Sequence, residues 1–147
     1  MSRHTSLCVT KTGLVISTEI PYLAASPDTL VQCDCCDLGV MEVKCPFAFR
    51  EATVDTFLAD PSSCVMVGED AQPQLKPGHA YYCQAQLQMF ACNAGYCDFT
   101  VYGERFILIV CVIRDTNFVQ RHLEKVRMFI LKATLPQMMA KVFAKQR

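Results

Sequence analysis

Three charged side chains in the first third of the chain, Asp28, Glu42 and Lys44, could together act on a phosphate ester. Residues two apart on a strand point to the same face, so a strand over 39–45 directs Glu42 and Lys44 to one side and Val43 to the other. If the preceding strand pairs with it as a hairpin, Asp28 comes alongside them. Two adjacent carboxylates repel each other unless a cation lies between them, and oxygen ligands favour Mg²⁺ or Mn²⁺. A lysine beside that ion can polarise a water or stabilise charge on a phosphoryl oxygen.

Taken singly, each of these three residues is typical of an exposed ion pair on a hairpin, which contributes little to stability. Their order along the chain, combined with a glutamine-bearing segment further on, favours a metal site. That segment contains Gln84, and its apolar residues recur at helical spacing. The neighbouring Gln86 and Gln88 leave an ordinary polar helix face as the alternative to a role in the site.

Three sequence pieces occur in the order of a known family: ASPD ending at Asp28, EVKCP starting at Glu42, and HAYYCQAQLQM starting at His79. Together they resemble the PD-(D/E)XK nuclease superfamily, in its lambda-exonuclease/YqaJ-type viral recombinase branch. An isolated ExK is uninformative, whereas the ordered combination of Asp, ExK and YxxQ is specific. The resemblance runs from about Gly13 to Ile113. It implies an α/β (α+β) fold with a central mixed β-sheet flanked by helices, the restriction-endonuclease-like core.

The resemblance also implies roles for individual residues. Asp28, Glu42 and the backbone carbonyl of Val43 would bind Mg²⁺ or Mn²⁺, Lys44 would be the catalytic lysine, and Gln84 would orient the lysine or the attacking water. Members of the family digest DNA, commonly as exonucleases, in recombination or repair, and some are ring-shaped homo-oligomers. They also carry an N-terminal helical part, whereas this sequence starts almost at the core sheet. We therefore expect one domain over residues 1–147 that lacks this part.

Charge is distributed unevenly along a chain whose formal net charge is +0. Acidic residues dominate from 28 to 70, which suits a cation, and basic residues dominate from 118 onward, which suits a polyanion. The basic Arg121 and Lys125 are therefore candidate DNA contacts, and Tyr81 is a further candidate. The alternative for the basic segment is a solvated helix face opposite a buried apolar stripe.

A second candidate metal site lies in the turn of the same hairpin. Cys33, Cys35 and Cys36 could bind zinc through their thiolates. The C-x-C-C pattern, however, lacks the paired C-x₂-C spacing of zinc knuckles, and no complete set of four ligands is evident. Most of the remaining cysteines fall in apolar patterns and are typical of small core residues.

The expected secondary structure places the candidate residues in a sheet with helices packed on it. A helix beginning near Gly78 would carry Gln84, and Asp115 would cap a C-terminal helix. The full set of expected elements is a hairpin of strands 6–10 and 14–18, a hairpin of strands 23–33 and 39–45, a helix over 52–59, a surface loop over 62–77, a helix over 78–93, a hairpin of strands 96–102 and 105–113, a helix over 115–131 and a shorter helix after Pro136.

The composition predicts a globular protein: the 147 residues are 52% hydrophobic and 19% charged. The longest apolar run, 106–113, is much shorter than the roughly 20 residues of a membrane-spanning helix, and the N-terminus has no hydrophobic signal core. We expect a soluble intracellular protein with reduced cysteines, nuclear or cytoplasmic.

The leading hypothesis is a Mg²⁺-dependent DNA exonuclease that acts in DNA recombination or repair. The alternative is a catalytically inactive nucleic-acid-binding or interaction module that retains the nuclease fold. A third interpretation is a zinc-binding interaction domain built on the cysteine cluster.

Overall fold

The structure, a computed structural model, describes residues 5–144. The chain forms two compact units, residues 1–114 and residues 115–147. The first unit contains the sheet and every residue of the Asp, ExK and YxxQ pieces.

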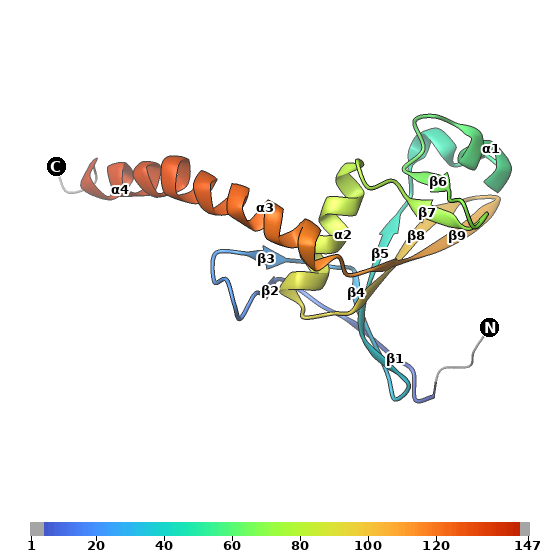
Figure 1. The fold of residues 1–147 in the computed structure, drawn as a ribbon, viewed down its shortest axis with the longest axis horizontal. Helices are drawn as coiled ribbons and strands as arrows, with labels where there is room; N and C mark the ends of the chain where they lie inside the picture. Colours follow the sequence, from blue (N-terminus) through green and yellow to red (C-terminus); the bar gives the residue numbers. More distant parts are fainter. Residues whose placement is uncertain (1–4, 145–147) are drawn as a thin grey trace. The chain divides into compact units, whose positions relative to one another are not determined.

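A five-stranded mixed sheet forms the first unit, with strand order β1-β4-β5-β8-β9 (Figure 1). β5 and β8 pair in parallel, and the other neighbouring strands are antiparallel. The segment joining β5 to β8 contains helix α2, as a crossover between parallel strands requires. The strands are β1 (Cys8–Lys11), β4 (Thr29–Cys33), β5 (Cys36–Lys44), β8 (Tyr96–Gly103) and β9 (Phe106–Ile113).

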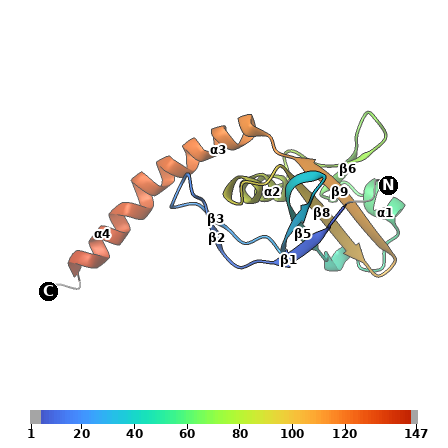
Figure 2. The same ribbon diagram turned by 90° about the horizontal axis from the view of Figure 1, so that it is seen from below.

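One face of this sheet packs against α2 (Ala80–Ala91), which lies beside β5 and β8 in both views (Figures 1 and 2). Alternate residues of β8 point to this face, and Phe99 is among the buried ones. Ala85 and Met89, one helical turn apart on α2, are fully buried in the same core. The buried face of β8 and the buried face of α2 therefore pack together in one apolar layer, as the sequence predicts.

A close approach of two strands explains why residue 39 is glycine. Gly39 of β5 pairs with Tyr96 of β8, and the Tyr96 ring lies over the glycine. A Cβ atom added at Gly39 would meet the ring at 2.3 Å. Because glycine has no side chain, the Tyr96 ring can lie directly over β5 at this pair.

Two expectations about the strands are wrong. The segments 6–10 and 14–18 do not pair with each other: β1 pairs with β4, whereas β2 (Val15–Ile16) pairs with β3 (Ala24–Ala25). A nearby turn signal predicted a local hairpin, but each segment forms its ladder with a later strand. Residues 62–77 are not simply a surface loop, because β6 (Val65–Val67) and β7 (Pro73–Leu75) form a hairpin. Val65 and Leu75 are buried in the core, which gives this hairpin its own hydrophobic contribution.

The other elements of the first unit agree with the sequence. The hairpins β4–β5 and β8–β9 form as expected, with β4 starting at Thr29, later than predicted. Helix α1 (Val54–Ala59) is capped by Thr53, whose side chain accepts a hydrogen bond from the Thr56 backbone N–H. A short 3₁₀ turn (Phe47–Phe49) follows Pro46 at the end of β5.

The second unit is helical. Asp115 caps α3 (Thr116–Phe129), because its Oδ1 accepts a hydrogen bond from the Phe118 backbone N–H at 2.9 Å, which confirms the predicted cap. A π-helical segment (Ile130–Thr134) leads directly into α4 (Leu135–Ala144), so the last helix is continuous with α3 rather than separate. Among the helices of residues 5–144, none has the length and apolar character needed to cross a membrane.

Candidate active site

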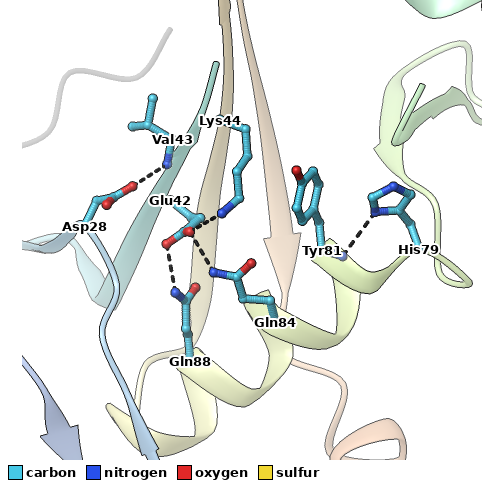
Figure 3. A network of polar contacts seen from close by, with 8 residues as sticks. All are labelled: Asp28, Glu42, Val43, Lys44, His79, Tyr81, Gln84 and Gln88. Carbon is cyan, nitrogen blue, oxygen red and sulfur yellow. Dashed lines mark hydrogen bonds and ion pairs between the residues drawn. The ribbon is translucent and has the colours of Figure 1, made fainter. Parts of the chain in front are cut away.

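The carboxyl end of β5 carries an ion pair on the face that α2 covers. Lys44 Nζ lies 2.5 Å from Glu42 Oε1 (Figure 3). The Glu42 side chain is 7% exposed and that of Lys44 is 21% exposed. A carboxylate this deeply buried is stable only if polar groups replace its water shell. The contacts that Glu42 makes with α2 supply those groups.

Two glutamines of α2 donate hydrogen bonds to the Glu42 carboxylate. Gln84 Nε2 lies 2.7 Å from Glu42 Oε1, and Gln88 Nε2 lies 2.8 Å from Glu42 Oε2 (Figure 3). The two glutamines are four residues apart and therefore share a helix face. Donors from α2 and β5 thus bond both oxygens of the Glu42 carboxylate.

The three glutamines of α2 do not form a single polar face. Gln86 points away from Glu42, and its Nε2 donates to the Ile113 backbone carbonyl at 2.9 Å. Gln84 and Gln88 therefore belong to the site, and Gln86 ties α2 to the end of β9. Sequence reasoning missed the contact of Gln88 with Glu42. The signal that could have found it is the four-residue spacing from Gln84.

Asp28 lies beside this cluster, immediately before β4. Its Oδ2 accepts a hydrogen bond from the Val43 backbone N–H at 2.7 Å (Figure 3). β4 and β5 pair Thr29 with Met41, so the register extended by one residue sets Asp28 opposite Glu42. Residues directly opposite in an antiparallel pair share a face. The predicted hairpin is therefore present, and joint metal binding by Asp28 and Glu42 stays a prediction.

The donor set at this point suits a hard divalent cation. Asp28 and Glu42 offer carboxylate oxygens only, and each carboxylate has about four lone-pair sites. Three of these sites on Glu42 accept from Lys44, Gln84 and Gln88, and one site on Asp28 accepts from Val43. Oxygen sites remain on both residues for an ion. Within residues 5–144, no third carboxylate, imidazole or thiol groups with this pair. An ion there would keep several waters, as Mg²⁺ commonly does.

The Tyr81 ring lies beside the Lys44 ammonium group. Lys44 Nζ lies 4.9 Å from the centroid of the Tyr81 ring, which in turn lies 5.6 Å from the Phe99 ring. His79 caps α2, because its Nδ1 accepts a hydrogen bond from the Tyr81 backbone N–H at 3.1 Å. His79 therefore belongs to the helix start, where it fixes the first turn that carries Tyr81 (Figure 3).

A thiol near Glu42 is held in its neutral form. Burial raises the pKa of Cys97 to about 12, and the charge of Glu42 contributes in the same direction. Only a thiolate is a good nucleophile, so Cys97 acts as an apolar core residue beside the site.

The remaining predicted site residues belong to other elements of the chain. Arg121 and Lys125 are exposed on α3 in the second unit, four residues apart and so on one helix face, and their DNA contact stays a prediction. Cys33, Cys35 and Cys36 converge at the turn between β4 and β5, at the opposite end of β5 from Lys44.

Comparisons with known proteins bear on the family and the fold of this chain. Residues 2–95 match the family described as the YqaJ-like viral recombinase domain. The alkaline nuclease of Autographa californica nuclear polyhedrosis virus is 27% identical over 112 residues, which covers 68% of this chain and 27% of that nuclease.

Solved structures show the same fold. The alkaline exonuclease LHK-Exo from Laribacter hongkongensis, and LHK-Exo in complex with dAMP, each match with a TM-score of 0.67 and 25% identity over 97% of this chain. The chain spans 66% of the LHK-Exo chain. The predicted α/β fold with a mixed sheet is confirmed by this likeness.

Proposed function

Because the chain belongs to the YqaJ-like viral recombinase domain family, we propose that it is a metal-dependent deoxyribonuclease that removes nucleotides from DNA ends. The observation that carries this proposal is the buried Glu42 carboxylate, held by Lys44, Gln84 and Gln88 with Asp28 opposite. A surface ion pair needs no such arrangement. DNA recombination or repair is the process in which we place the activity. The likeness to alkaline exonucleases supports the proposed activity, and the family description as a viral recombinase domain supports the proposed process.

Asp28, Glu42 and the Val43 carbonyl are the groups that would hold the ion. When bound, Mg²⁺ supplies Lewis-acid stabilisation of the negative charge on the phosphoryl oxygens. The Lys44 ammonium, fixed by Glu42, donates a hydrogen bond to the attacking water or to a phosphoryl oxygen. Gln84 donates to the same Glu42 oxygen as Lys44 and so orients the lysine.

The reaction that this site would perform is hydrolysis of a phosphodiester. The water oxygen forms a bond to phosphorus and the bond from phosphorus to O3′ breaks. Overall, the water supplies a hydroxyl to phosphorus and a proton to O3′, which leaves a 5′-phosphate on the product. LHK-Exo has been crystallised with dAMP, a deoxynucleoside monophosphate, and we propose products of that class for this chain. Tyr81, beside Lys44, and the basic Arg121 and Lys125 are the proposed DNA contacts.

The proposal is tested with the purified chain and end-labelled linear duplex DNA. We expect release of 5′-mononucleotides with Mg²⁺ and none with EDTA, because removing the ion leaves the phosphoryl charge without its main counter-charge. Covalently closed circular DNA is the matched substrate and should resist, since it has no end. Binding of DNA with no Mg²⁺-dependent product would instead establish the inactive binding module.

Gln88 is a further residue that we assign to this site, in a positioning role. It is 3% exposed and its amide nitrogen bonds Glu42 Oε2, whereas its Oε1 has no hydrogen-bond partner within residues 5–144. A buried polar atom without a partner costs free energy. The contact with Glu42 offers a reason for an amide at this buried position.

Replacing Gln88 with methionine should lower activity by about 10- to 100-fold and raise the Mg²⁺ concentration for half-maximal rate, because the loss of a hydrogen bond to a metal ligand has effects of this size. Gln86→Met is the matched control. It also removes a buried amide from α2, but the nitrogen of that amide bonds the Ile113 carbonyl and not Glu42. The Mg²⁺ titration separates the two roles: a purely structural contribution of Gln88 would leave the half-maximal concentration unchanged.

A further inference from the structure

Three cysteine sulfurs converge at the turn between β4 and β5. Cys33 is the last residue of β4 and pairs across the turn with Cys36, the first residue of β5. Cys33 Sγ lies 3.5 Å from Cys35 Sγ, and Cys35 Sγ lies 3.8 Å from Cys36 Sγ. All three sulfurs lie within 4.8 Å of one another. Cys33 is buried, and the other two are exposed.

These distances match the edges of a metal–thiolate polyhedron. Sulfurs bound to Zn²⁺ at about 2.3 Å in a tetrahedron lie about 3.8 Å from one another. The distances of 3.5 and 3.8 Å are close to this value. A disulfide would need a separation of roughly 2.05 Å. The separations are therefore compatible with the binding of one shared ion by the three sulfurs.

Backbone contacts fix the turn that carries these thiols. Besides the pairing of Cys33 with Cys36, the Asp34 backbone N–H donates to the Thr5 carbonyl at 3.0 Å. A register shift between Val31 and Cys33 sets the end of β4 relative to β5. Among residues 5–144, this is the only set of three or more metal-binding side chains close enough to share an ion.

Ligand chemistry separates this cluster from the proposed nuclease site. Thiolates select soft or borderline ions, whereas the carboxylates of Asp28 and Glu42 select hard ones. Glu42 lies six residues after Cys36 on the same strand, a separation of roughly 20 Å. Strand β5 thus carries residues of two candidate metal sites that differ in the ions they prefer.

We propose that Cys33, Cys35 and Cys36 form a trithiolate site for Zn²⁺, with water as the fourth ligand, that stabilises the β4–β5 hairpin. On binding, the three thiols release their protons to solvent as sulfur–zinc bonds form. The bound ion joins the two strands at the turn and holds the register that sets Asp28 opposite Glu42.

The test uses the reduced, metal-stripped full chain titrated with Co²⁺ as an optical probe and then with Zn²⁺. We expect one Co²⁺ per chain with a thiolate charge-transfer band, displacement by one equivalent of Zn²⁺, and a rise of several degrees in the thermal midpoint with Zn²⁺. Cys35→Ser and Cys36→Ser should lose the band and the rise. Both residues are exposed, so the variants keep the fold, which circular dichroism checks.

Cys111→Ser is the matched control, because Cys111 is also an exposed cysteine on a strand of the sheet but lies outside the cluster. It should bind Co²⁺ and Zn²⁺ like the parent chain. Absence of stoichiometric binding by the parent, or equal binding by Cys35→Ser and Cys36→Ser, would overturn the proposal. Retention of zinc by Glu42→Gln is also expected, so failure of the nuclease assignment and failure of the zinc site give different results.

Discussion

Lys44→Ala is expected to reduce Mg²⁺-dependent hydrolysis of linear DNA by about 10²- to 10³-fold or more, while the chain stays folded and still binds DNA. Loss of one positioned donor to a developing negative charge has an effect of this order. Lys44 Nζ is the charged donor that we assign to this role, and its contacts with Glu42 and the Tyr81 ring hold it in place.

The structure gives reasons why this variant should fold. The Lys44 side chain is partly exposed, so its removal opens no large cavity in the core. Glu42 keeps both amide donors of α2 after the lysine is gone. Thermal unfolding of the variant therefore measures how much the ion pair contributes to stability, separately from activity.

Lys11→Ala is the control for the general loss of a positive charge. Lys11 is exposed at the end of β1, in the same sheet. Single-turnover rates with saturating DNA, measured for both variants, separate chemistry from binding. Equal rates for Lys44→Ala and the parent chain would eliminate Lys44 as the catalytic lysine.

Glu42→Gln is expected to reduce the rate of metal-dependent cleavage by about 10²-fold or more, as Lys44→Ala does, with little change in the thermal midpoint of unfolding. The substitution keeps the shape of the side chain and removes one of the two carboxylates that we propose as ion ligands. Its effect on activity should therefore be much larger than its effect on stability.

Hydrogen bonding around residue 42 can adapt to the amide. Glutamine side chains can rotate by half a turn and exchange their donor and acceptor groups. Gln88 Oε1, which has no hydrogen-bond partner within residues 5–144, would then accept from the new amide. Lys44 would lose its carboxylate partner, but its partial exposure lets water solvate the ammonium.

Glu51→Gln is the matched control for this charge change. Glu51 pairs with Arg50 at 2.9 Å on an exposed surface, where an ion pair contributes little. Isothermal titration with Mg²⁺ or Mn²⁺ gives a second measurement that does not depend on turnover. Unchanged metal affinity in Glu42→Gln would place the ion elsewhere and contradict the assigned ligand set.

Local sequence pattern predicted much of the scaffold. The alternation of apolar residues on β8, the helical spacing on α2 and the aspartate cap of α3 are each encoded within a few neighbouring residues. The predicted hairpin of segments 6–10 and 14–18 failed because these segments do not pair with each other. β1 and β2 carry strand-forming residues, but their partners, β4 and β3, come later in the chain. Turn chemistry alone cannot choose between such partners.

The sequence by itself determined the residue types at the site and the face that Glu42 and Lys44 share, because the period of a strand is two. Only the tertiary structure decided that Gln88 bonds Glu42 and Gln86 does not, since this depends on the rotation of α2 about its axis against the sheet. It also decided that the three sulfurs at the β4–β5 turn converge, because their separations depend on a register shift in the hairpin that C-x-C-C spacing does not specify.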